Sequence, residues 1–169
     1  MSTIQSRVGN LDSLPQGGTY DLLLIDFPNG FPQSILKFNI NDTPRKVTGL
    51  QKVAQTFLKI LFSSVGSNLL YQDQGTNFPN LVINANISSS DPVFLSELSG
   101  EIKSAESQTI AILNTSGSDA ASQLDSITIL GLDVGQESAI MYLSVLTAAG
   151  ATAQVSVPFP QLDLVLSNN

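Results

Sequence analysis

Residues Thr48 to Leu61, with the sequence TGLQKVAQTFLKIL, contain the clearest helix pattern in the chain. Their apolar side chains recur with a helical period and form one stripe, made of Leu50, Val53, Ala54, Phe57, Leu58, Ile60 and Leu61. Thr48 and Gln51 have the spacing of a capping box, in which two side chains satisfy donors at the start of a helix. The small residues at 65–67 end the pattern. We therefore expect a helix over roughly residues 49–64 whose apolar stripe lies in the core.

A second helix is expected to begin at Asp91, an N-cap residue, with Pro92 at the first helical position. Its apolar positions are expected at Leu95, Leu98, Ile102, Ala105, Thr109 and Ile112. The polar stretch 67–90 before it reads as an irregular loop. A loop of that length is usually functional or held by another part of the molecule.

Strand patterns lie on both sides of the helices. Residues 20–27 and 33–40 flank an Asn-Gly turn at 29–30 and predict a hairpin. Residues 123–134, 138–148 and 152–157 predict three further strands, with Thr128, Leu130, Leu132 and Val134 on one face of the first and Met141, Leu143, Val145 and Thr147 on one face of the second. The order predicts an α+β fold, in which two helices pack on a mainly antiparallel sheet, with an N-terminal hairpin and extended terminal arms.

The 169 residues fit one domain. We expect an N-terminal arm at 1–18, a single α+β domain at 19–157 and a C-terminal tail at 158–169. The Pro-Phe-Pro at 158–160 is expected to break the pairing of the last strand.

The composition argues against catalysis and bound cofactors. The chain has no histidine, cysteine or tryptophan, which removes thiolate nucleophiles, disulfides and the commonest general base and metal ligand. No dinucleotide, phosphate or calcium motif is present. Glu97 and Glu101 lie one helical turn apart, but acid–base catalysis by this pair is a remote alternative, and a structural polar contact is expected for Glu106. We expect a protein that is not an enzyme and holds no cofactor or metal.

The charge pattern bears on partners. The net charge is −7, and six acidic residues but no basic ones follow Lys103. This distribution argues against nucleic-acid binding. Arg45, Lys46 and Lys52 are interpreted as a solvated helix entrance, although they could meet an acidic partner. The first 13 residues lack a secretory signal, and the longest aliphatic run, residues 22–25, is far too short to span a membrane.

Three features favour protein assembly. Charged residues make up only 12% of the chain, about half the usual ~25%, the N-terminal arm is polar, and the tail is apolar without an assigned partner. An exposed strand of this kind pairs readily with another chain. The candidate assembly interface is Val155, Val157, Phe159, Leu162, Leu164, Val165 and Leu166. The alternative is that the tail folds back onto its own sheet. We expect the segment after Ala151 to be dispensable for folding.

The helix at 49–61, the residues Ser64 to Ser67 and the segment Gly75 to Phe78 (GTNF) together resemble the baseplate wedge, or sheath-initiator, family of contractile phage tails and related injection systems. Members of this family have such a helix, a small-residue turn, a "G-T/S-x-L/F" segment, a second helix and a closing meander. The likeness covers about residues 45–157. The family's Glu-Pro-Arg motif is absent, and its nearest counterpart is Glu106 to Gln108 (ESQ).

The resemblance implies a virion structural protein in the tail baseplate, made in the host cytoplasm. It would dock on sheath, tube and wedge subunits in a sixfold-symmetric assembly and template the sheath by β-strand addition. It implies no nucleic-acid or membrane partner, and the "lysozyme-like" label of some members is not carried over as an activity. Another tail protein, such as a tube, terminator or adaptor subunit, is the alternative, and a carboxylate-dependent hydrolase is the remote one.

Overall fold

The computed structural model describes residues 21–22, 25–26, 37–38, 46–84, 90–115, 117, 119–135 and 138–160. Within them the chain has the predicted α+β fold. Its helices are α1 (Gly49–Leu61), α2 (Phe78–Asn84), α3 (Pro92–Thr115) and the short 3₁₀ helix η2 (Ala120–Ser122). Its strands are β1 (Asp21–Leu22), β2 (Ile25–Asp26), β3 (Lys37–Phe38), β4 (Lys46–Val47), β5 (Leu124–Val134), β6 (Ser138–Thr147) and β7 (Thr152–Pro160).

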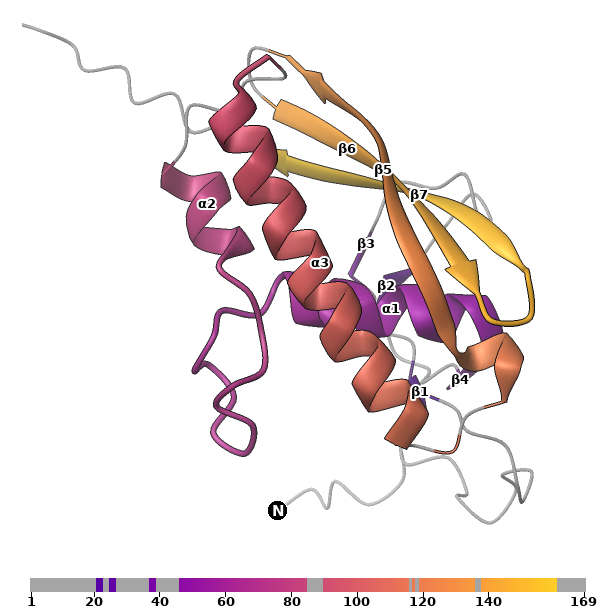
Figure 1. Cartoon of the computed structure of the whole chain (residues 1–169). Helices are drawn as coiled ribbons and strands as arrows, with labels where there is room; N and C mark the ends of the chain where they lie inside the picture. Colours follow the sequence, from indigo (N-terminus) through magenta and orange to yellow (C-terminus); the bar gives the residue numbers. More distant parts are fainter. Residues whose placement is uncertain are drawn as a thin grey trace, which may run out of the picture.

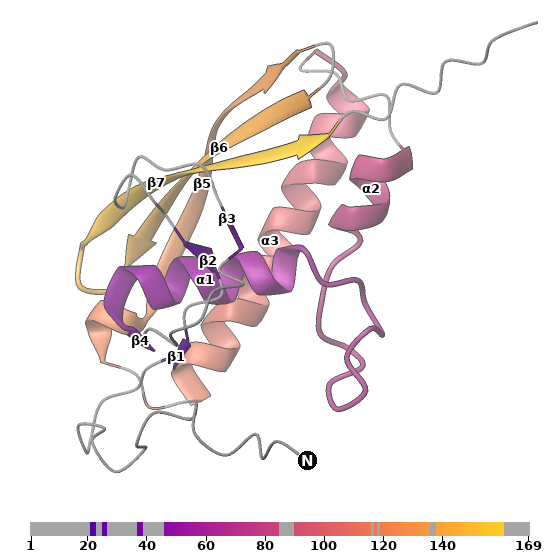
Figure 2. The same ribbon diagram turned by 180° about the vertical axis from the view of Figure 1, so that it is seen from behind.

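The main sheet is an antiparallel meander in the order β5-β6-β7, and helices α1 and α3 lie against one of its faces (Figure 1). The view from behind shows α1 crossing below the sheet while α3 runs along its side (Figure 2). Strand β6 is the centre of this layer, because its alternate residues Ala139, Met141, Leu143, Val145 and Thr147 are all buried. Those five side chains face the helices, so the predicted alternation of β6 is confirmed.

The inward face of β5 differs from the prediction. Ile127 and Ile129 pair with Val145 and Leu143, but the register then shifts, so that Leu132 pairs with Met141. A β-bulge places one extra residue in the strand and reverses the alternation of side chains. Leu132 therefore packs against the core as predicted, whereas Leu130 is 50% exposed. Thr128 is exposed as well.

Strand β7 runs through both of its prolines, so the expected break at Pro158 is wrong. The register with β6 is continuous from Leu146↔Thr152 to Ser138↔Pro160. Proline is tolerated there because β7 is an edge strand and its N–H groups at alternate positions are not needed by β6. Val155 and Val157 are core residues, which argues against the expectation that the segment after Ala151 is dispensable for folding.

Helix α1 begins as predicted, but its first turn is held differently. Thr48 is the N-cap residue and its side chain makes no capping hydrogen bond, so the predicted capping box does not form. Instead, the N–H of Gly49 donates to Oγ of Ser122 over 3.0 Å, 73 residues away in sequence. The glycine has a φ of +56°, a left-handed conformation that other residues adopt at a cost. The start of α1 is therefore tied to η2 at the entry to the sheet.

Helix α3 begins at the predicted cap, where Oδ1 of Asp91 accepts from the N–H of Val93 over 2.9 Å. Its buried stripe differs from the prediction at both ends: Leu95 and Ile112 are more than one third exposed. The buried residues are spaced more widely on average than the predicted ones. A straight helix has 3.6 residues per turn, so a strict alternation of 3 and 4 residues does not stay on one face. The buried positions are Phe94, Leu98, Ile102, Ala105, Thr109 and Leu113.

Helix α2 lies within the stretch that the sequence indicated as a loop, and it buries Phe78, Leu81 and Val82. In the N-terminal part, β2 pairs antiparallel with β3, as the predicted hairpin requires, and β1 pairs with β4. The Asn-Gly turn of that hairpin, the arm at 1–18 and the tail after Pro160 lie outside the described residues.

Candidate assembly interface

The outer edge of β7 is the part of the sheet where another strand could be added. In the connection between β6 and β7, the N–H of Thr147 donates to the carbonyl of Ala151 over 2.9 Å, which places odd-numbered β7 residues opposite β6 in hydrogen-bonded pairs. Even-numbered residues then direct their backbone groups to the outer edge. Thr152, Gln154 and Ser156 each have an N–H to offer there, whereas Pro158 and Pro160 have none.

Within the described residues, no strand pairs with this outer edge of β7. The edge is therefore divided along its length: its first part can donate and accept hydrogen bonds, and its last part can only accept. Prolines at an edge restrict pairing with other chains. A strand added to this protein would find a complete set of backbone partners only between residues 152 and 157.

The predicted interface residues fall into three groups. Val155 and Val157 point inward and are at most 2% exposed, so they could join an interface only through their backbone. Phe159 pairs with Ala139 in the ladder of β7 with β6. The tail residues Leu162, Leu164, Val165 and Leu166 lie outside the described residues. The interface itself stays a prediction.

The segment that carries the family resemblance is anchored at the end of α1. Thr76 is 1% exposed, and its Oγ1 donates to the carbonyl of Leu61 over 2.7 Å while its N–H donates to the carbonyl of Ser63 over 2.8 Å. The same Oγ1 accepts from the N–H of Phe78 over 3.2 Å. One threonine thus satisfies carbonyls at the end of α1 and a free donor at the start of α2. The Gly-Thr pair is visible in the sequence, but the sequence does not indicate which residues Thr76 bonds to.

Gly75 stands beside this anchor and allows no side chain. Its φ is +116°, and a Cβ at this position would lie 2.5 Å from the carbonyl oxygen of Ser63. Its backbone is also held by α3, because Oε1 of Gln108 accepts from the N–H of Gly75 over 2.9 Å and Nε2 of Gln108 donates to its carbonyl over 2.8 Å. We call Gly75, Thr76 and Gln108 the latch. The latch confirms the expectation that the long loop is held by another part of the molecule, here α3.

The three carboxylates of α3 have different surroundings. Oε2 of Glu101 accepts from the N–H of Asn77 over 2.7 Å, next to the latch, while Glu97 is exposed. Glu106 is half-buried as expected, but its Oε2 is buried without a hydrogen-bond partner among the described residues, so the expected polar contact is not made there. No group of carboxylates that could hold a metal ion occurs in the described part of the chain.

The basic group at the start of α1 also differs from the interpretation. Lys52 is only 6% exposed and is therefore not part of a solvated helix entrance. The aliphatic stem of a lysine can lie along apolar surface while its charged end finds a polar group. The side chains of Arg45 and Lys46 are outside the described set. In the helices that the structure describes, none is long and apolar enough to cross a membrane.

Comparison with known proteins finds a distant structural likeness. Neither a protein-family model nor a curated protein matches the chain. A solved structure that resembles it is the crystal structure of a "putative tail lysozyme" from Geobacter sulfurreducens. The likeness has a TM-score of 0.44 and 13% sequence identity, and it covers 66% of this chain and 89% of that one.

Proposed function

We propose that this protein is a structural component of a contractile phage tail baseplate, of the wedge or sheath-initiator type. It docks on other baseplate subunits and templates attachment of the sheath by β-strand addition at the outer edge of β7. The observation that carries the proposal is the outer edge itself, which offers the N–H groups of Thr152, Gln154 and Ser156 and has no partner strand in the described residues.

The latch supports the same proposal. The residues of the resemblance, from Gly75 to Phe78, are the ones that join the end of α1 to α2 and α3. A short motif is informative when each of its residues has a physical task in the fold. Here the glycine allows a close backbone approach, the threonine bridges two helices, and Phe78 is fully buried.

The proposed partners are sheath, tube and wedge subunits, with copies arranged in the sixfold symmetry of a tail. The sparse charge of the chain fits this role, since uncharged polar surface loses less on desolvation than charged surface does. Neither nucleic acid nor a membrane is proposed as a partner, and no catalysis is proposed. Nearby genes for sheath, tube and spike proteins would favour this assignment over a tube, terminator or adaptor subunit.

The test removes edge donors without touching the ladder to β6. The Ser156→Pro and Gln154→Pro substitutions each delete one outward N–H, and proline is tolerated at such edge positions. Each full-length variant is mixed with purified sheath subunits from the same genome, and sheath growth is followed by electron microscopy. We expect sheath attachment to fall at least tenfold, while the Ser156→Ala variant, which keeps its N–H, attaches normally.

Hydrogen exchange provides the second measurement. On attachment of the sheath, the amides of Gln154 and Ser156 are expected to gain protection, while amides in the β5–β6 ladder change little. If both proline variants fold and still attach the sheath, or if the edge amides gain no protection, strand addition at β7 is wrong.

A further inference from the structure

Three consecutive large apolar side chains stand exposed at the tip of the loop between α1 and α2. Leu69 is 88% exposed, Leu70 85% and Tyr71 66%. Single exposed apolar residues are common on protein surfaces, but a contiguous set is characteristic of an interaction site. This tip lies away from the main sheet, at the far end of the loop shown in Figure 1.

The tip is held in shape by its own hydrogen bonds. The N–H of Gly66 donates to the carbonyl of Gln72 over 2.9 Å, and the N–H of Gln74 donates to the carbonyl of Tyr71 over 3.0 Å. Oδ1 of Asn68 accepts from the N–H of Leu70 over 3.0 Å. The latch fixes the base of the loop. A surface ordered in advance loses less entropy on binding, so the tip is suited to recognition.

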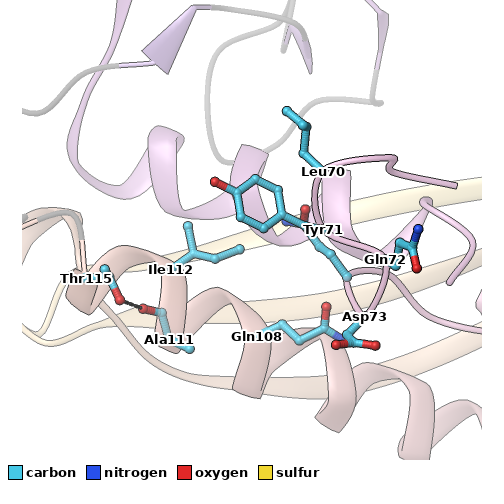
Figure 3. Close-up of a pocket in the computed structure, with 9 residues that line it drawn as sticks. Leu70, Tyr71, Gln72, Asp73, Gln108, Ala111, Ile112 and Thr115 are labelled. Atoms are coloured by element: carbon cyan, nitrogen blue, oxygen red, sulfur yellow. Dashed lines mark hydrogen bonds between the residues drawn. The ribbon is translucent and has the colours of Figure 1, made fainter. Parts of the chain in front are cut away.

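Helix α3 forms the opposite wall of a groove with this tip. Its residues Gln108, Ala111, Ile112 and Thr115 line the groove, and they follow the i, i+3, i+4, i+7 spacing of one helix face. Figure 3 shows Tyr71 and Leu70 from the loop above Ile112 and Ala111 of the helix. The cavity has a volume of about 720 Å³. Ile112 is 38% exposed here and lies on α3 between the groove and the buried stripe.

The negative charge in the groove bears on which kind of molecule could bind there. Asp73 is the one charged residue among those that line it. The chain as a whole carries −7 and has no basic residue after Lys103. A second copy of this chain would bring acidic surface to an acidic site, and an anionic lipid surface would be repelled as well. A segment with basic residues beside its apolar side chains is complementary in both respects.

We infer that the groove between residues 69–73 and residues 108–115 is a docking site for an amphipathic helix of a partner protein, with lysine or arginine flanking its apolar face. The exposed face of α3 provides the ridges against which a helix packs, and Ala111 allows close approach. Leu70 and Tyr71 close over the apolar side chains of the occupant. This site is separate from the β7 edge and does not rest on the proposed function.

The test uses a display library of 18-residue helical peptides, selected on the immobilised full-length chain. The stripe positions vary among apolar residues, and the flanking positions vary among Lys, Gln and Glu. We expect enriched peptides to favour Lys over Glu beside the stripe. Their binding should weaken at least tenfold in the Leu70→Ser and Ile112→Ser variants. With Asp73→Lys, the flanking preference should reverse to Glu.

Val93→Ser is the matched control, because Val93 is 64% exposed on the same helix but does not line the groove. It should leave peptide binding unchanged. Failure to enrich any peptide, or binding that survives Leu70→Ser, overturns the inference. Sedimentation that shows a dimer lost in Leu70→Ser would make a second copy the occupant. Leu70-dependent flotation with phosphatidylcholine–phosphatidylglycerol vesicles would make it a membrane, and either result contradicts the inference.

Discussion

The side-chain amide of Gln108 forms two hydrogen bonds with the backbone of Gly75, accepting from its N–H over 2.9 Å and donating to its carbonyl over 2.8 Å. The two residues are 33 positions apart, so this pair joins the middle of α3 to the loop after α1. A hydrogen bond of this kind contributes about 1 kcal/mol net. The pair therefore matters more for where the loop lies than for the total stability of the domain.

Replacing Gln108 with alanine tests this relationship. We expect the free energy of unfolding to fall by about 1–3 kcal/mol, because both backbone groups of Gly75 lose their partner in a partly buried place. Amide exchange at Gly75 should accelerate more than exchange in the main sheet. Urea denaturation and hydrogen exchange measure the two effects, and an exchange rate at Gly75 equal to that of wild type would contradict the role given to the pair. Gln72→Ala, at an exposed position, is the control.

The Gly75→Ala substitution should be among the most harmful single changes in the chain. The new Cβ would meet backbone atoms at 2.5 and 2.9 Å, and the positive φ adds strain. Left-handed strain alone costs of order 1–3 kcal/mol, so a loss above about 2 kcal/mol is expected. Gly100→Ala is a matched control in α3, where nothing lies within 4 Å of the new methyl group. It should stabilise the protein by up to about 1 kcal/mol in urea denaturation. Equal effects of the two substitutions would refute this account.

Phe57 tests the packing of α1. The side chain is 1% exposed and belongs to the core beneath the sheet. Phe57→Ala should lower the free energy of unfolding by about 3–5 kcal/mol, enough to unfold a marginal domain. Thermal melting followed by circular dichroism measures this change. Phe57→Leu keeps most of the volume and should cost clearly less; a melting temperature unaffected by alanine would place the stripe outside the core.

Two truncations separate the role of β7 from that of the tail. Ending the chain after Gly150 removes Ala153, Val155 and Val157 from the core, so the protein should lose its cooperative unfolding transition. Each such side chain contributes up to about 1.5–3 kcal/mol through burial. Ending it after Pro160 keeps the whole strand, and the melting temperature should stay close to that of wild type. A large loss of stability in the second truncation would mean that the tail packs on its own domain.

The Glu101→Gln substitution tests our proposal that the protein is not an enzyme. Its Oε2 accepts from the N–H of Asn77, so the Glu101→Gln variant keeps an acceptor and should lose about 1 kcal/mol or less. Neither wild type nor variant is expected to hydrolyse peptidoglycan or a glycoside. Turnover by the wild type that disappears in Glu101→Gln, with the fold intact by circular dichroism, would revive the hydrolase alternative.

Local patterns in the sequence were enough for the main elements. The cap at Asp91, the stripe of α1 and the alternation of β6 each depend on neighbours in the chain, and all three are present. Features that depend on distant residues were missed. Ser122 rather than Gln51 supports the start of α1, and the bulge near Leu130 is set by pairing with β6.

In the candidate sites, too, features that depend on neighbouring residues could be predicted, and features that depend on distant residues could not. The Gly-Thr pair at 75–76 was visible as a motif, but its hydrogen bonds to Leu61 and Gln108 come from the packing of three elements. The prolines of β7 predict a break that the structure does not have, because the sequence does not say whether a strand lies at the edge of a sheet. Helix α2 was missed because its apolar run is only a few residues long, and such runs do not distinguish helix from strand.

The two prolines at the end of β7 limit the length of the outer edge that has N–H donors. Residues 152–156 span about 17 Å of extended strand, and beyond them the edge has no further donor. A partner chain that paired here would find no N–H donor from Pro158 onward, however long its own extended segment was. The spacing of the two prolines would therefore limit how many complete hydrogen-bonded pairs an incoming strand could form along this edge.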